Sequence, residues 1–237
     1  MKRIFYILLF LPLSITTYSQ QYEGVFKEGG DVLKFENEKV YFNMNEMGNM
    51  ITNKVGEGSY EILGDYLLVK TGEYSGEKSS VQPLPGSKED SVGIKVTDNR
   101  NFSLPGILVE LLNSSGKTLH GGVTDSDGKF FFKKNSKGHT IKVSDMGYDN
   151  ISFAYDPTND FLVKLVKNDV IENQTVVFKL KKVDDETLSV LLLSTDFNPG
   201  KNQLKALEKL DKKARKSNYI DKYMKKEYEP YQPNLQQ

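Results

Sequence analysis

The sequence predicts an all-β protein with two β domains and a C-terminal α-helical tail. Short runs of β-branched and aromatic residues, broken by Gly, Asn and Asp, fill two blocks on either side of a segment rich in Ser, Gly and Pro. Near its end the chain changes to helix-forming residues, with apolar positions close to a 3.6-residue period. With 237 residues, the chain can form one or two domains that each bury a core.

Residues 1–19 have the order of a secretory signal peptide. Lys2 and Arg3 precede the apolar run 4–13, and small or polar residues follow it. The run is too short to cross a bilayer as a stop-transfer helix, so we expect cleavage before Gln20 and no transmembrane segment in the mature chain. A Gln after the cleavage site resembles exported proteins of the Bacteroidetes. An uncleaved membrane anchor is the alternative, because apolar length alone separates the two imperfectly.

The composition excludes several kinds of chemistry. The chain has no Cys, which excludes disulfides, thiolate nucleophiles, zinc ribbons, iron–sulfur clusters and the lipid anchor of a bacterial lipoprotein. Two His residues leave little for metal binding or acid–base catalysis. The 32 basic and 32 acidic side chains favour no class of partner. We therefore expect no catalytic residue, no cofactor and no metal site.

Residues 20–74 are predicted to form an antiparallel meander. Along 31–36 apolar and polar residues alternate, as in a strand with one buried and one wet face. Turn residues at Gly29-Gly30, Glu36-Asn37 and Gly64-Asp65 separate the runs. The expected strands are 22–27, 31–36, 39–43, 58–63 and 66–70.

The pattern Gly-x-Tyr-x-Ile-x-Gly-Asp-x-Leu-x-Val over 58–69, after a Gly-aromatic opening and a Leu-x-Phe strand, resembles the lipocalin-like sheets of exported Bacteroidetes proteins. The resemblance implies a meander or barrel. Its interior would be the place for a small apolar ligand. The candidate lining residues are Phe26, Phe35, Tyr41 and Tyr60.

Residues 75–90 are predicted to be an exposed linker, because they contain Ser, Gly, Lys, Glu, Pro83 and Pro85 and almost nothing to bury. A new alternating pattern starts at Val92 and defines a second β domain, residues 91–167. Strands are expected at 94–98, 104–111 and 140–144, with a turn between two strands over 122–132.

The second domain resembles the carboxypeptidase regulatory-like family of transthyretin-type β-sandwiches. The matching positions, in order, are Val96, Asp98, Pro105, Val109, Leu111, Thr124, Asp125, Gly128, Phe130, Phe132, Ile141, Val143, Ser144, Gly147 and Tyr148. Residues 101–104 depart from the Gly-rich loop of the family, which affects one loop and not the fold. The zinc site of the peptidases lies in a different domain, and no zinc ligand set occurs here. The resemblance implies an accessory module that stabilises or positions its neighbours.

Five of these positions are predicted to shape the turns of the sandwich. Thr124 and Asp125 can bond backbone N–H groups, Gly128 supplies a left-handed conformation, and Gly147 bends the chain before a buried Tyr148. The run Asp125-Ser-Asp-Gly also resembles the start of a calcium loop. A plain turn is favoured over calcium, because no Glu follows at the twelfth position.

Residues 168–196 are predicted to form a β-hairpin, with strands at 175–181 and 187–193. The hairpin could extend the sandwich. We favour its return to the first sheet, because two more strands would cover edges that the meander leaves open. The sandwich would then be an insertion in the first domain.

Residues 197–237 are predicted to be a basic helical tail. Helix formers extend over 201–228, with ten Lys or Arg against four Asp or Glu. The plainer interpretation is a solvated helix that rests an apolar stripe on the barrel. The other is contact of Lys201–Lys226 with an anionic surface such as a membrane, a glycan or an acidic partner. Nucleic acid is not an expected partner, because aromatic platforms beside the charges are lacking.

Taken together, the sequence predicts an exported, non-catalytic binding or scaffold protein of the periplasm or cell surface, with an envelope protein or glycan as partner. The alternative is a lipocalin-like carrier of a small apolar ligand in the first domain. An enzyme would require carboxylates such as Glu61 and Asp65 to converge in a cleft. A filled barrel interior would favour the first hypothesis and an apolar cavity the second.

Overall fold

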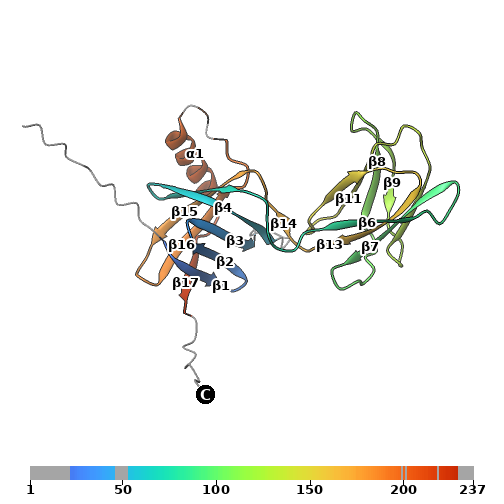
Figure 1. The fold of residues 1–237 in the computed structure, drawn as a ribbon. Helices are drawn as coiled ribbons and strands as arrows, with labels where there is room; N and C mark the ends of the chain where they lie inside the picture. Colours follow the sequence, from blue (N-terminus) through green and yellow to red (C-terminus); the bar gives the residue numbers. More distant parts are fainter. Residues whose placement is uncertain (1–21, 46–52, 199, 201, 218, 229–237) are drawn as a thin grey trace, which may run out of the picture.

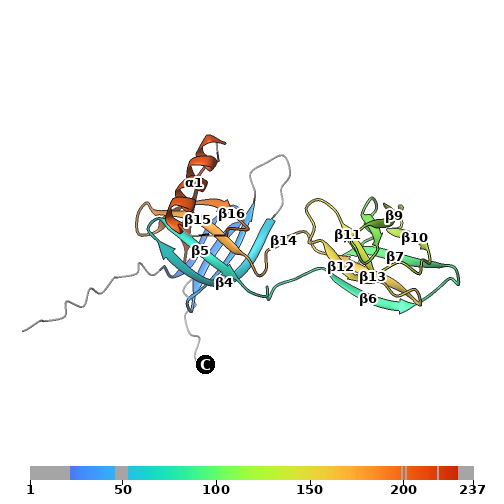
Figure 2. The ribbon, with the colours of Figure 1, turned by 90° about the horizontal axis from the view of Figure 1, so that it is seen from above.

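The computed structural model describes residues 22–45, 53–198, 200, 202–217 and 219–228. The predicted signal peptide lies outside these residues. The described chain forms two β domains, and the views in Figure 1 and Figure 2 show two passages of the chain running between them. We call residues 72–79 the first passage and residues 166–174 the second passage.

The first domain is a barrel of eight antiparallel strands. Its strands are β1 (Gly24–Glu28), β2 (Asp31–Glu36), β3 (Lys39–Asn45), β4 (Asn53–Leu63), β5 (Tyr66–Thr71), β15 (Thr175–Lys182), β16 (Thr187–Ser194) and β17 (Lys222–Glu227). They follow the order β5-β4-β3-β2-β1-β17-β16-β15, and pairing of β15 with β5 closes the barrel. The short β14 (Asp169–Val170) adds to β4 in parallel.

Strand alternation and two-residue turns explain the barrel. In β2, Leu33 and Phe35 are buried inside while the residues between them are more exposed. The β2–β3 turn has positive φ at Asn37 and Glu38, 50° and 60°, which is one residue beyond the expected turn. The interior is filled by one cluster of buried side chains: Phe26, Leu33, Phe35, Val40, Phe42, Met44, Leu67, Val69, Ile171, Val176, Phe178, Leu180, Leu188, Val190 and Met224.

The second domain is a sandwich of two four-stranded sheets. Its strands are β6 (Ser80–Pro85), β7 (Ser91–Asp98), β8 (Leu108–Leu112), β9 (Thr118–Val123), β10 (Lys129–Lys133), β11 (Thr140–Ser144), β12 (Ile151–Ala154) and β13 (Asn159–Leu165). One sheet has the order β10-β7-β13-β6 and the other β12-β11-β8-β9. Both sheets contribute to one core, which includes Ile94, Leu111, Ile141 and Val163.

The sandwich is inserted in the barrel, because the hairpin β15–β16 pairs with β5 and β17 and not with the sandwich. Barrel strands therefore precede and follow the sandwich along the chain. For the residues that the structure describes, the all-β class is confirmed, with a lipocalin-like barrel and one helix towards the C-terminus.

The predicted linker 75–90 is partly wrong, because β6 lies within it and pairs with β13 along six residue pairs. The strand is an edge of its sheet and is largely exposed. Pro83 and Pro85 are tolerated there because an edge strand needs hydrogen bonds on one side only. Because β6 has few apolar residues to bury, the sequence pattern did not indicate a strand there.

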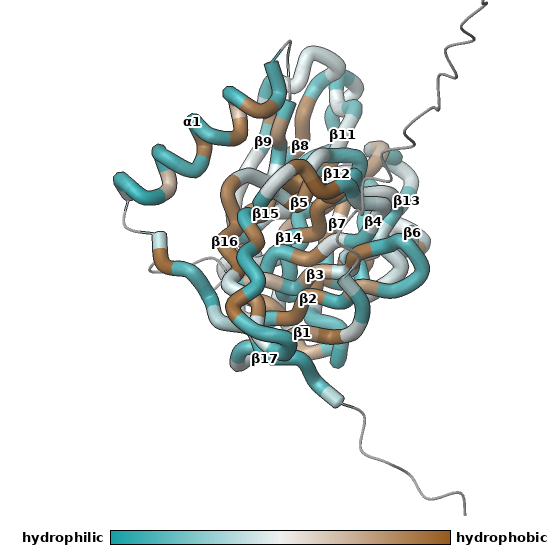
Figure 3. Tube along the Cα trace, turned by 90° about the vertical axis from the view of Figure 1, so that its left-hand side faces the viewer, coloured by the Kyte–Doolittle hydropathy of each residue, from teal (hydrophilic) through white to brown (hydrophobic). Residues whose placement is uncertain are grey.

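The predicted helix over 201–228 is also partly wrong. The helix α1 covers Gln203–Lys216, and residues 222–227 form β17 instead. Met224 is fully buried there, and β17 pairs with both β1 and β16, so two ladders outweigh the helical tendency of the segment. In Figure 3, apolar and polar residues alternate along α1, which lies beside the largely apolar β16. Within the described part of the chain, no helix has the length and apolar character needed to span a membrane.

Candidate functional site

The predicted ligand-lining residues occupy two different environments. Phe26 and Phe35 belong to the core of the barrel, with ring centroids 6.1 Å apart. Tyr60 packs against this core, and its ring centroid lies 5.5 Å from that of Phe35. These three residues pack against other side chains of the barrel interior.

Tyr41 does not line the interior, contrary to the prediction. It lies between the buried Val40 and Phe42 in β3, so its side chain faces outward. There it stacks on Tyr74 of the first passage, with ring centroids 6.2 Å apart. Burial, and next a hydrogen bond with Tyr41, raise the pKa of Tyr74. Tyr41 therefore holds the start of the first passage against the outside of the barrel.

The predicted turn residues of the sandwich make local hydrogen bonds. The Asp125 carboxylate accepts from the backbone N–H groups of Asp127 and Lys129, at 2.9 and 2.8 Å. The buried Thr124 hydroxyl accepts from Ile107 N–H at 3.0 Å. Gly128 has φ +70°, and a Cβ there would lie 2.5 Å from the Val96 carbonyl oxygen. These contacts give the Thr124–Gly128 segment a structural role.

We expect Gly128→Ala to destabilise the sandwich by at least about 1 kcal/mol, because Ala disfavours the positive φ of this position. The close contact between the added Cβ and the Val96 carbonyl oxygen should destabilise it further. Gly116→Ala is the matched control, since Gly116 has φ +79° and open space around it. In urea denaturation, Gly116→Ala should have a higher free energy of unfolding than Gly128→Ala. Calcium or a chelator should leave the melting temperature of the wild type unchanged, and a rise of several degrees with calcium would contradict the plain turn.

Gly147 and Tyr148 lie in the connection from β11 to β12. Gly147 has φ +85°, consistent with a bend before Tyr148. Tyr148 is half-buried against the sandwich core rather than fully buried, and Lys167 Nζ lies 5.8 Å from its ring centroid. Desolvation raises the pKa of Tyr148, followed by the charges of Asp145 and Asp98. Tyr148 therefore places the β11–β12 connection of the sandwich beside the second passage.

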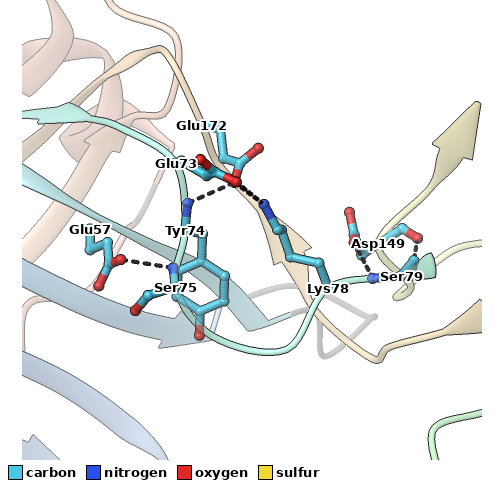
Figure 4. A network of polar contacts seen from close by, with 8 residues as sticks. All are labelled: Glu57, Glu73, Tyr74, Ser75, Lys78, Ser79, Asp149 and Glu172. Carbon is cyan, nitrogen blue, oxygen red and sulfur yellow. Dashed lines mark hydrogen bonds and ion pairs between the residues drawn. The ribbon is translucent and has the colours of Figure 1, made fainter.

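Sequence reasoning missed the polar network that ties the two passages together (Figure 4). Glu172 of the second passage accepts from Tyr74 N–H at 2.7 Å and from Lys78 Nζ at 2.9 Å, both in the first passage. At the barrel, the Glu57 carboxylate accepts from Ser75 N–H at 2.7 Å. One carboxylate thus joins both passages, and another joins the first passage to β4.

A second group of contacts fixes the passages to the sandwich. Asp149 accepts from Ser79 N–H at 2.7 Å, and the Ser79 hydroxyl donates to the Asp149 carbonyl at 2.6 Å. The same hydroxyl accepts from Val166 N–H at 3.0 Å. Ser79 therefore links the first passage to the β11–β12 connection and to the start of the second passage. The only sequence signal was a cluster of polar residues in a segment interpreted as a plain linker.

The pKa values at this junction have different causes. Bonds from Tyr74 N–H and then Lys78 lower the pKa of Glu172. The hydrogen bond to Glu172 is the main cause that raises the pKa of Lys78. Burial raises the pKa of Asp149, against the opposing bonds from Ser79. The ionised Glu172 is therefore favoured by its contacts, whereas burial disfavours the ionised Asp149.

We expect the bonds of Glu172 to persist at neutral pH and to be lost only as the pH falls through its lowered pKa. A carboxyl group with a lowered pKa stabilises the fold above its ordinary pKa of about 4.3 and loses that contribution on acidification. The Tyr74 amide shift in an NMR titration should therefore change with a midpoint below the ordinary pKa of a Glu. Glu172→Gln should remove this transition. A midpoint at or above that of a free Glu would contradict the bonding.

Glu61 and Asp65 are the acidic residues considered for catalysis. Glu61 of β4 lies 3.8 Å from Lys70 Nζ and accepts from Gln203 at 3.2 Å. Asp65 lies in the β4–β5 turn, where its backbone carbonyl accepts from Leu180 N–H at 2.7 Å. Among the residues that the structure describes, no three His, Cys, Asp or Glu side chains are grouped so as to hold a metal ion.

No protein-family model matches the chain, and no curated protein matches it. The resemblance of residues 92–165 to the carboxypeptidase regulatory-like family therefore stays a prediction.

Proposed function

We propose that the chain is an exported, non-catalytic binding protein of the bacterial cell envelope, in which the barrel is a platform that presents the sandwich to a partner. The observation that carries the proposal is the joining of both passages by Glu172, through Tyr74 and Lys78. A chain that only tethers two domains needs no such bonds. A chain that presents one domain in a fixed orientation does need them. If the domains moved freely, binding of the partner would have to fix their orientation, and this loss of entropy would lower the affinity.

The filled barrel supports the same proposal. A platform needs a rigid core, and the aromatic and aliphatic side chains of the interior pack into one cluster. The resemblance of the sandwich to an accessory domain agrees with a presenting role, and the signal-peptide pattern agrees with the envelope. An envelope protein or glycan is the proposed partner.

The outer face of the β12-β11-β8-β9 sheet is the proposed contact surface. Leu108 and Val123 lie directly opposite each other on β8 and β9 and are 39% and 58% exposed. Met146, 67% exposed, follows the end of β11, which pairs with β8 at Leu108. Apolar side chains on a protein-binding surface are removed from water when the partner binds.

The test is affinity capture from an envelope fraction, with the chain from Gln20 to Gln237 as bait. Leu108→Ser with Val123→Asp should abolish capture of the partner that the wild type retains. Val183→Asp, at a 50% exposed position in the β15–β16 turn of the barrel, is the matched control and should retain it. Equal capture by both variants would contradict the contact surface. Protein recovered from the native host should begin at Gln20 or Gln21, and a cytoplasmic location would contradict export.

A further inference from the structure

A pocket of about 340 Å³ lies between α1, the second half of β16 and residues 219–222. It forms because β17 pairs with β16 only as far as Val190, while β16 continues to Ser194. The part of β16 beyond Val190 therefore lacks β17 beside it, and α1 covers it incompletely. Met44 and Val190 of the barrel core also line the pocket, so it adjoins the barrel interior that the sequence suggested for a ligand.

The walls of the pocket combine apolar and polar side chains, and the apolar ones lie on facing elements. Leu191 and Leu193 of β16 form one side, and Leu210 and Ala214 of α1 form another. Ile220, which is 61% exposed, lies at the edge. The volume is at the lower end of the range for ligand pockets, which are lined by apolar side chains with few polar groups. These walls fit a small aliphatic group.

The rim of the pocket is basic. Lys213 lines the pocket and also an adjoining groove, where Lys209, Lys212 and Lys216 are further lining residues. Among the described residues that line the pocket, Asp196 is the one carboxylate, and it accepts from the Ser194 hydroxyl at 3.0 Å. The other lysine of the pocket, Lys222, forms an ion pair with the buried Asp31. Excess positive charge therefore lies at one side of the pocket, next to its leucine side chains.

We propose that this pocket binds a single-chain amphipathic anion, with its aliphatic chain between β16 and α1 and its acidic head at Lys213. An apolar ligand without charge would leave Lys213, and the three further lysines of the adjoining groove, without a counter-charge. A strongly polar anion would leave the leucine walls exposed to water. An amphipathic anion, whose head is a carboxylate or a phosphate, complements both. This proposal does not depend on the presenting role of the barrel.

The experiment uses the chain from Gln20 to Gln237 with sodium dodecanoate, below the concentration at which it forms micelles. Calorimetry should show saturable binding, and native mass spectrometry should show one dodecanoate per chain. Dodecanol has the same aliphatic chain without the negative charge, and it should bind more weakly than dodecanoate. Dodecyl phosphate should bind as dodecanoate does. Equal affinity for dodecanol, or no binding of dodecanoate, would overturn the proposal.

Two variants locate the site. Lys213→Glu should weaken dodecanoate binding roughly tenfold, because it places like charge beside the head group. Lys205→Glu is the matched control on the same helix, away from the pocket, and should bind as the wild type does. Ser217→Phe should block the pocket from an exposed position on its wall. Unchanged binding in both Lys213→Glu and Ser217→Phe would overturn the proposal. Binding to vesicles of anionic phospholipid without binding of dodecanoate would also overturn it, in favour of a membrane surface.

Discussion

Deletion of residues 218–237 is expected to prevent the barrel from folding. The deletion removes β17, which pairs with β1 on one side and β16 on the other, and leaves both strands with an open edge. It also removes Met224, which is fully buried in the core. We expect an aggregated or unfolded product, seen by size-exclusion chromatography and by loss of a cooperative thermal transition.

Two further variants make this result specific to β17. Deletion of residues 229–237 only, which lie outside the described residues, should leave a cooperatively melting protein. Met224→Ala should fold but lose about 3 kcal/mol of unfolding free energy, the usual cost of a buried Met. A monomeric, cooperatively melting protein after deletion of 218–237 would show that β17 does not close the barrel.

Gly58→Ala is expected to destabilise the barrel by about 3 kcal/mol or more, because the added methyl group has no room. A Cβ at Gly58 would lie 1.9 Å from the Lys70 carbonyl oxygen and 2.8 Å from Thr71 Cα. These are backbone atoms of the paired strand β5, so relief requires the strands to separate. The measurement is the urea midpoint of unfolding.

Gly72→Ala is the matched control for Gly58→Ala. Gly72 lies at the start of the first passage, has no positive φ, and a Cβ there would meet nothing within 4 Å. Its substitution should change the free energy of unfolding by less than about 0.5 kcal/mol. Equal stability of the two variants would mean that β4 and β5 do not approach so closely at Gly58.

Strand alternation made much of the fold predictable. The strands around Leu33 and Phe35 and the hairpin at 175–194 were expected near their observed positions, because a buried and a wet face impose a period of two. The return of the hairpin to the barrel followed from the need to cover open edges. The period of two and the open edges are both visible in a single sequence.

The errors occurred where tertiary pairing outweighed local preference. Residues 222–227 have helix-forming composition, yet Met224 completes the barrel core as part of a strand. β6 has too few apolar residues to be recognised, and its pairing with β13 depends on a neighbour distant in sequence. Tyr41 could have been placed outside from its alternation with Val40 and Phe42. The Glu172 contacts with Tyr74 and Lys78 join residues more than ninety positions apart, which spacing alone does not reveal.

The distance between spin labels on the two domains tests the presenting role most directly. Glu36→Cys on the barrel and Lys137→Cys on the sandwich are exposed sites in a chain without native Cys. Glu172→Ala with Asp149→Ala removes two carboxylates of the junction and leaves Glu57 in place. Glu73→Gln is the control, because that side chain is 88% exposed and reaches Lys78 Nζ only at 3.5 Å. We predict one narrow distance distribution in the wild type and in the control, and a broad one in the double variant. A broad distribution in the wild type, or an unchanged one in the double variant, would contradict the account.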